Sequence, residues 1–137
     1  MQRTFSILKP DTVKAGKAGI VLAEIEKAGF QIRAMKLLHL TEAQAQGFYY
    51  VHKERPFFGS LVKFMTEGPI VAMVLEADNA IERLRKTMGA TDPSKADNGT
   101  IRKLFGTNIE RNAIHGSDGP DTAAFETSYF FNQLEIL

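Results

Sequence analysis

Histidine is the side chain whose ordinary pKa lies nearest neutral pH, and the chain has three, His39, His52 and His115, together with no cysteine. Thiol nucleophiles and thiolate metal sites are therefore excluded. The histidines also lack the H-E-x-x-H spacing of a zinc hydrolase. His39 stands between Leu38 and Leu40, which favours a core or sheet-face position. His52 lies among charged residues, where a solvated role and a role in a site are equally open.

His115 has a different setting. It stands where a predicted strand ends and a turn flanked by glycines begins, with Ser117 and Asp118 close by in the sequence. A helix N-terminus is expected to open at Pro120, and such an arrangement presents a side chain in a cleft. A histidine in a turn can equally serve structure alone, so the local chemistry leaves both roles open.

Two common nucleotide-binding motifs are absent. The chain has no G-x-G-x-x-G and no G-x-x-x-x-G-K-[ST], although Gly16 and Lys17 offer a fragment of the second. This disfavours a P-loop kinase. The net charge is only +1, from 17 basic and 16 acidic residues, so any anion site must be built by local clustering of cations.

The stretch around His115 resembles the active-site signature of the nucleoside diphosphate kinases. The signature is N-x-x-H-G-S-D followed by an acidic residue in the next helix, and it falls here in Asn112–Glu126. Similar family patterns occur in the right order over nearly the entire chain: FSILKPD near the N-terminus, Tyr49 through His52 to KERPFFGSLVKFM, GPIVAMVLE, GATDP and GTIRKLF.

The resemblance implies that His115 is the phosphoryl carrier of a ping-pong reaction. It would take the terminal phosphoryl group of a nucleoside triphosphate and return it to a different nucleoside diphosphate. In the family the attacking nitrogen is Nδ1 while a glutamate orients Nε2, and that glutamate corresponds to Glu126, with Ser117 assisting. Without the resemblance, Glu126 would be taken for an ordinary solvated helix residue.

The same resemblance assigns cations and donors to the triphosphate, which phosphoryl transfer needs for positioning and charge neutralisation. The matching residues are Arg85, Thr91 and Arg102. Taken singly, they would be a helix-surface charge, a turn former and part of a basic pair. Tyr49 and His52 would support the phosphate end.

The remaining implied contacts are those of the sugar, the base and the metal. Lys9 and Asn112 would hold the sugar hydroxyls, with Lys9 also close to the transferred group. Phe57 would cover one face of the base, opposite Ile109, where many relatives carry valine. Stacking uses a surface that every base has, so broad base specificity is expected. Magnesium would arrive bound to the nucleotide phosphates, with Asp118 at most a water-mediated contact and no metal ligands from the protein.

Hydrophobic periodicity and turn residues predict the elements that must position these groups. Thr4–Leu8 is a predicted strand, ended by Pro10 and Asp11, because proline cannot continue a central ladder. Lys17–Ala28 is a predicted helix, ended by a left-handed Gly29. The next strand is predicted by the alternation of Phe30, Ile32 and Ala34, with an irregularity near Met35.

Two helices are predicted in the middle of the chain. A capping box at Thr41 and Gln44 opens the first, which runs toward Val51. Beyond Pro56, the second has an apolar stripe at Phe58, Leu61, Val62 and Met65.

The later elements follow from similar signals. They are a buried strand over Ile70–Leu75, a helix capped by Asp78 or Asn79 with Ile81, Leu84 and Met88 inward and Gly89 at its end, a long loop over 89–100, a short helix near Ile101–Phe105, a strand over Ala113–His115 and a closing helix from Pro120. This order favours one α+β fold, a ferredoxin-like four-stranded antiparallel sheet with helices packed on it.

Length and composition fit a single nucleoside diphosphate kinase domain over residues 1–137. The longest apolar run, Ile70–Leu75, is too short to span a bilayer, so a protein of the cytoplasm without membrane contact is expected. The implied partners are nucleoside di- and triphosphates such as ATP and GDP, and further copies of the chain in a tetramer or hexamer, although sequence leaves a dimer open. No obligatory nucleic acid is expected.

Two other functions compete with the kinase. FFGSLVKF bears a likeness to the aromatic strand motif of RNA-recognition domains, but it has helical rather than alternating periodicity and the charge is low. A catalytically inactive relative that acts as a scaffold is the other, although every key position of the resemblance is retained.

Overall fold

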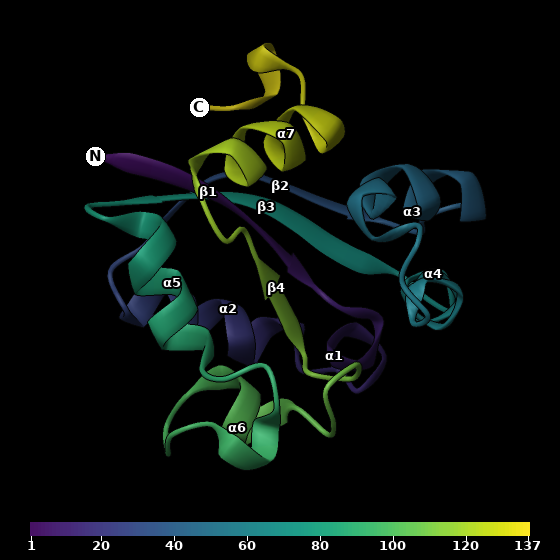
Figure 1. The fold of residues 1–137 in the computed structure, drawn as a ribbon. Helices are drawn as coiled ribbons and strands as arrows, with labels where there is room; N and C mark the ends of the chain where they lie inside the picture. The colour runs from purple at the N-terminus through teal and green to yellow at the C-terminus, as the bar shows by residue number, and fades with distance from the viewer.

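The computed structural model describes residues 1–137 and confirms a four-stranded antiparallel sheet with helices on both faces (Figure 1). The strands are β1 (Gln2–Leu8), β2 (Gln31–Leu38), β3 (Ile70–Ala77) and β4 (Ile114–Gly116). Their order is β2-β3-β1-β4, and each neighbouring pair is antiparallel. This is the predicted ferredoxin-like arrangement, with β1 and β3 at its centre.

The helices are α1 (Pro10–Lys14), α2 (Ala18–Lys27), α3 (Glu42–Phe48), α4 (Phe58–Met65), α5 (Ala80–Met88), α6 (Ile101–Phe105) and α7 (Pro120–Phe130). Short 3₁₀ turns lie at Tyr50–His52, Pro93–Lys95 and Gln133–Glu135. Helix α7 lies on one face of the sheet, while α2 and α5 lie on the other (Figure 1). Helices α3 and α4 lie together at one end of the sheet.

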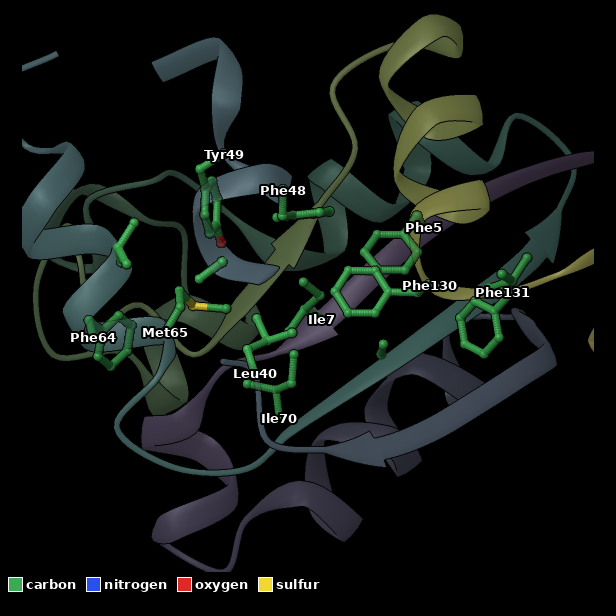
Figure 2. Close-up of a cluster of buried hydrophobic side chains, with 14 of the residues drawn as sticks. Phe5, Ile7, Leu40, Phe48, Tyr49, Phe64, Met65, Ile70, Phe130 and Phe131 are labelled. Carbon is green, nitrogen blue, oxygen red and sulfur yellow. The ribbon is translucent and has the colours of Figure 1, made fainter. Parts of the chain in front are cut away.

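The sheet separates two hydrophobic cores. Along β3, Ile70, Ala72 and Val74 belong to one core, and Val71, Met73 and Leu75 belong to the other. Successive side chains of a strand point to opposite faces, so a strand covered on both faces is apolar at every position. This explains the unbroken apolar run of the sequence. Figure 2 shows the first core, in which Phe5 of β1 and Phe130 of α7 stack with ring centroids 5.1 Å apart.

The predicted helix ends are largely confirmed. Thr41 and Gln44 form both hydrogen bonds of a capping box at the start of α3. Gly29 and Gly89 follow α2 and α5 with φ of +97° and +88°. Asn79 is the N-cap of α5, as predicted, but its side chain makes no bond to the helix backbone and its own φ is +53°.

Other expectations from the sequence need correction. Pro10 and Asp11 do end β1, but they also open helix α1, because proline at a first helical position loses no backbone bond. The apolar stripe of α4 faces the core as predicted, with Val62 and Met65 buried and Phe58 and Leu61 half-buried against it, but Phe64, which the prediction left out, is buried with them.

The end of β2 also differs from its prediction. The irregularity lies earlier than Met35, as a shift of register between Ile32 and Ala34. His39 is not in the core or on the sheet; it follows β2 and is exposed, with Nε2 2.6 Å from the carbonyl oxygen of Thr66. Strand β2 lies at the edge of the sheet and ends at Leu38, so His39 lies beyond the part of the strand that other elements cover.

The segment FFGSLVKF forms the start and middle of helix α4, as its periodicity predicted. It therefore cannot serve as the aromatic strand of an RNA-recognition domain. None of the helices combines the length and the hydrophobicity of a membrane-spanning segment.

Candidate active site

His115 lies at the middle of β4, on the face of the sheet that α7 covers. It pairs with Ile7 in the β1–β4 ladder, and directly opposite residues of an antiparallel pair point to the same face. Ile7 belongs to the core beneath α7. The imidazole packs against the ring of Phe48 with centroids 5.7 Å apart and against Phe5 at 6.4 Å. Its side chain keeps 21% exposure, so the ring is held firmly but remains open to a ligand.

Glu126 of α7 orients this imidazole. His115 Nε2 lies 2.8 Å from Glu126 Oε1, and Ser117 Oγ donates to the same oxygen at 2.6 Å. A carboxylate beside Nε2 favours a proton on that nitrogen, which leaves the lone pair of neutral imidazole on Nδ1. The sequence singled out all three residues, and the structure brings them into contact.

A cleft opens beside His115 and contains two of the predicted cations. Its lining is formed by Phe48, Tyr49, Val51, His52, Arg85, Thr91, Arg102, His115, Gly116, Asp118, Thr122 and Glu126. Arg85 and Arg102 carry charges of the same sign, and burial together with the charge of Arg85 lowers the pKa of Arg102 to about 10. A pair of neighbouring cations in a cleft that also exposes His115 is suited to an anionic ligand.

The two arginines are held in different ways. Arg102 is only 7% exposed and donates to the carbonyl oxygens of Gly89 at 3.1 Å and Ile114 at 2.9 Å. Its Nε is buried with no protein partner. Arg85 lies exposed on α5. That helix approaches β4 closely because Gly116 has no side chain: a Cβ there would lie 2.6 Å from Met88 Sδ.

Lys9 and Asn112 contact one another instead of lining the cleft. Lys9 Nζ donates to Asn112 Oδ1 at 2.8 Å, and both residues are buried. Asn112 Nδ2 donates to the carbonyl oxygens of Thr91 at 3.0 Å and Ile109 at 2.9 Å. Burial, followed by repulsion from Arg102, lowers the pKa of Lys9 to about 8. Asn112 therefore connects Lys9 to the loop that carries Thr91.

Phe57 and Ile109, the predicted base-contacting pair, lie outside the cleft lining. Their exposed fractions are 47% and 62%. The Phe57 ring lies next to His52, with centroids 5.5 Å apart. Two large apolar side chains are thus open to solvent, one of them beside a residue of the cleft.

Several residues that support the site were not assigned this role from the sequence. Ser6 Oγ donates to the carbonyl oxygen of His115 at 2.7 Å. Thr122 Oγ1 accepts from the backbone N–H groups of Asp118 at 3.2 Å and Gly119 at 3.0 Å, which fixes the turn after the histidine. A threonine in the first turn of a helix is a recognisable signal for such a bond. The contact of Ser6 has no local signal, because it crosses between strands.

Asp11 is a further supporting group that the sequence did not indicate, whereas Tyr49 was assigned to the phosphate end. Asp11 Oδ2 accepts from the N–H of Ala113 at 3.0 Å. Tyr49 lines the cleft, and its buried hydroxyl has no protein partner. Burial, and then the negative charge of Glu126, raises the pKa of this hydroxyl, so it stays protonated and available as a donor.

The cleft offers few carboxylates to a metal ion. No group of three His, Cys, Asp or Glu side chains gathers anywhere in the structure. Asp118 and Glu126 both face the cleft, and both already accept hydrogen bonds, from Thr122 and from Ser117. Such a donor set fits a magnesium ion whose ligands are mainly phosphates and water, because Mg²⁺ often uses one carboxylate or none from the protein.

Comparison with known proteins gives one consistent family. The sequence model described as Nucleoside diphosphate kinase matches residues 2–136. The chain is 58% identical to the nucleoside diphosphate kinase of Nitratidesulfovibrio vulgaris strain DP4, with 100% of this chain and 99% of that protein covered. It is 57% identical to that of Geobacter sp. strain M21, with both chains covered completely, at 100%.

Solved structures agree. The Aquifex aeolicus nucleoside diphosphate kinase is 46% identical, with a TM-score of 0.97 and 99% of each chain covered. A halophilic nucleoside diphosphate kinase from Halobacterium salinarum, in complex with CDP, is 38% identical with a TM-score of 0.95, covering 99% of this chain and 91% of that one.

Proposed function

This chain belongs to the nucleoside diphosphate kinase family, and from that premise we propose that it moves the terminal phosphoryl group between nucleotides through a phosphohistidine on His115. The observation that carries the proposal is the contact of His115 Nε2 with Glu126 at 2.8 Å. It leaves Nδ1 as the nucleophilic nitrogen, on a ring that is partly exposed at a cationic cleft.

In the first half-reaction the Nδ1 lone pair attacks the γ-phosphorus of a nucleoside triphosphate. The N–P bond forms while the bond from phosphorus to the β–γ bridging oxygen breaks, and a nucleoside diphosphate leaves with that electron pair. Nε2 keeps its proton, and the carboxylate of Glu126 stabilises the positive charge that develops on the ring. The second half-reaction is the reverse, with a different diphosphate as acceptor, so the kinetics are ping-pong.

Arg85, Arg102 and Thr91 provide the charge and the hydrogen bonds for the phosphates. The transferred group spreads negative charge over its oxygens, and fixed cations in a partly buried site stabilise that charge without reorganisation. Asp118, which lines the cleft, would contact a magnesium ion carried by the nucleotide at most through water. When bound, that ion would neutralise phosphate charge and orient the phosphate groups.

Lys9 and Asn112 are assigned to the sugar hydroxyls, and Phe57 is assigned to one face of the base, with Ile109 across from it. Phe57 is exposed and lies beside His52 of the cleft, which supports this assignment. Stacking does not read base edges, so purine and pyrimidine nucleotides are substrates alike. The relative from Halobacterium salinarum forms a complex with CDP, a pyrimidine nucleotide.

Residues 1–137 act as a single domain in the cytoplasm, within a homo-oligomer of four or six copies. Native mass spectrometry of the full chain measures the subunit count directly, and a monomer or a dimer would contradict this part of the proposal.

Incubation with magnesium and ATP labelled on the γ-phosphate tests the mechanism. We expect a label on the protein that is lost in acid, is retained in alkali, passes to GDP or CDP, and is absent from His115→Ala. Phosphorus NMR of the labelled protein distinguishes Nδ1 from Nε2 as the modified atom. Label that survives His115→Ala, or phosphorylation of Nε2, would contradict the assigned roles.

A further inference from the structure

The peptide two residues before His115 has an unusual conformation. Ala113 has a φ of +76°, and Asn79 is the only other non-glycine residue with positive φ. The N–H of Ile114 donates to the carbonyl oxygen of Asn112 at 2.9 Å, a bond that skips one residue and closes a γ-turn. With positive φ at its centre this is the rare, strained form of the turn. A residue with a Cβ adopts it only where its surroundings enforce it.

Three hydrogen bonds from the corner between β1 and α1 hold both polar groups of Ala113. Its N–H donates to Asp11 Oδ2 at 3.0 Å. Its carbonyl oxygen accepts from the backbone N–H of Lys9 at 2.9 Å and from Thr12 Oγ1 at 2.9 Å. Ala113 is fully buried, so water does not replace a lost partner.

Asp11 has the least replaceable of these contacts. The carbonyl oxygen of Ala113 has two donors, whereas the N–H has one acceptor, and that acceptor is Asp11. The second oxygen of Asp11, Oδ1, is buried without a protein partner, and burial raises the pKa of the carboxyl. A carboxyl group in such surroundings carries a desolvation penalty, which the bond to Ala113 helps to offset.

We propose that Asp11 is a positioning residue for the phosphoryl carrier: by holding the N–H of Ala113 it maintains the strained turn from which β4 begins, and so fixes the place of His115. The inference rests on the role of His115 proposed above. Strand β4 has three residues and pairs only with β1, so the position of its first residue depends strongly on the turn that precedes it. A shift of about 1 Å at a reacting group lowers a rate by about 100-fold.

Two other roles for Asp11 predict different results. Asp11 could act through its charge on neighbouring Lys9, which it attracts. It could also act as the acidic first-turn residue of α1, and so support only local folding. An amide at position 11 keeps an acceptor without the charge, and glycine at position 113 accepts positive φ without strain, so the two substitutions separate these roles.

The experiment measures three quantities for each variant of the full chain: the maximal rate of labelling at saturating ATP, the dissociation constant for ADP and the unfolding midpoint. For Asp11→Ala we expect the maximal rate to fall about 10- to 100-fold, with less than about a threefold change in the ADP constant. Asp11→Asn should stay within about threefold of wild type, since its amide oxygen accepts the same bond.

The combination Asp11→Ala/Ala113→Gly is the decisive variant, and we expect it to recover most of the rate lost in Asp11→Ala. Thr12→Val is the matched control. It removes a hydrogen bond to the same peptide but leaves the N–H held, so it should lower the unfolding midpoint without a comparable loss of rate.

The outcomes are distinguishable. Equal losses in Asp11→Ala and Asp11→Asn, or no recovery on adding Ala113→Gly, would overturn the inference. If Asp11→Ala does not fold, a folded and active double variant supports the inference, and a double variant that also fails to fold contradicts it. Wild-type protein without label on His115 would contradict the proposed function, whereas labelled wild type with an unaffected Asp11→Ala would contradict this inference alone.

Discussion

Arg102 donates a hydrogen bond from Nη2 to the carbonyl oxygen of Ile114 at 2.9 Å, directly before His115 in the sequence. A second bond joins Nη1 to the carbonyl oxygen of Gly89 at 3.1 Å. One residue thus connects α6, the end of α5 and the strand that carries the histidine. An arginine assigned to phosphate binding also supports the architecture of the site.

Comparison of Arg102→Met with Arg85→Met separates these two roles. Each should weaken ADP binding by about 10-fold or more, because each removes a charged donor that we propose binds phosphate. Arg102→Met should also lower the free energy of unfolding by about 2 kcal/mol, since two backbone carbonyls lose a charged donor. Arg85→Met should change stability by less than about 0.5 kcal/mol, because Arg85 is exposed. Urea unfolding without nucleotide and calorimetric titration with ADP measure the two effects. Equal free energies of unfolding for the two variants would show that Arg102 does not stabilise the fold.

Glu126→Ala should lower the maximal labelling rate of His115 by about 10- to 100-fold, because Nε2 loses the group that fixes its proton and orientation. Glu126→Gln keeps an acceptor for Nε2 and should lose less. Ser117→Ala should slow labelling in the wild-type background but have little effect once Glu126 is alanine, since Ser117 acts through that carboxylate. Single-turnover labelling of wild type, Glu126→Ala, Ser117→Ala and the double alanine variant measures this coupling. Additive effects would contradict a shared role.

The lowered pKa of Lys9 predicts a pH-dependent stability. Below pH 8 the lysine is protonated in both states, and between pH 8 and its ordinary value of 10.5 only the unfolded state retains the proton. The unfolded state then binds more protons, so the stability contributed by Lys9 rises across this window. Wild type should gain on the order of 3 kcal/mol relative to Lys9→Met between pH 7.5 and 10.5. Urea unfolding of both proteins at each pH measures the difference. If the free energies of unfolding of the two proteins change with pH in parallel, the pKa of Lys9 is not lowered.

Phe57→Ala should weaken binding of ADP, GDP and CDP to a similar degree, about 5- to 150-fold, because a base stacked on an aromatic ring gains about 1–3 kcal/mol. Stability should change little, since the ring is 47% exposed. Tyr50→Ala is the matched control: its exposure is 51%, and its ring lies next to Phe125 of α7, whereas Phe57 lies next to His52 of the cleft. Equilibrium titration with the three nucleotides measures the effect. A loss confined to one base would contradict a stacking role.

Much of the fold was predictable because local patterns report burial and chain direction. The unbroken run Ile70–Leu75 indicated a strand covered on both faces, and Thr41 with Gln44 marked the start of α3. Gly29 and Gly89 marked helix ends. Helix α1 was missed because its five residues hold too little periodicity to separate it from a turn.

The sequence by itself determined which residues bear the family pattern, with His115 among them, and which faces of the helices are apolar. Only the tertiary structure decided that Glu126 lies 2.8 Å from that histidine and that Asp11, in the first turn of α1, accepts a hydrogen bond from the N–H of Ala113 just before the neighbouring strand β4. Periodicity reports whether a face is buried, but not which element covers it. Which element covers a face depends on the pairing of β1 with both β3 and β4, and this pairing brings residues about a hundred positions apart into contact. The free energy of the whole chain decides the pairing, so no local pattern reports it.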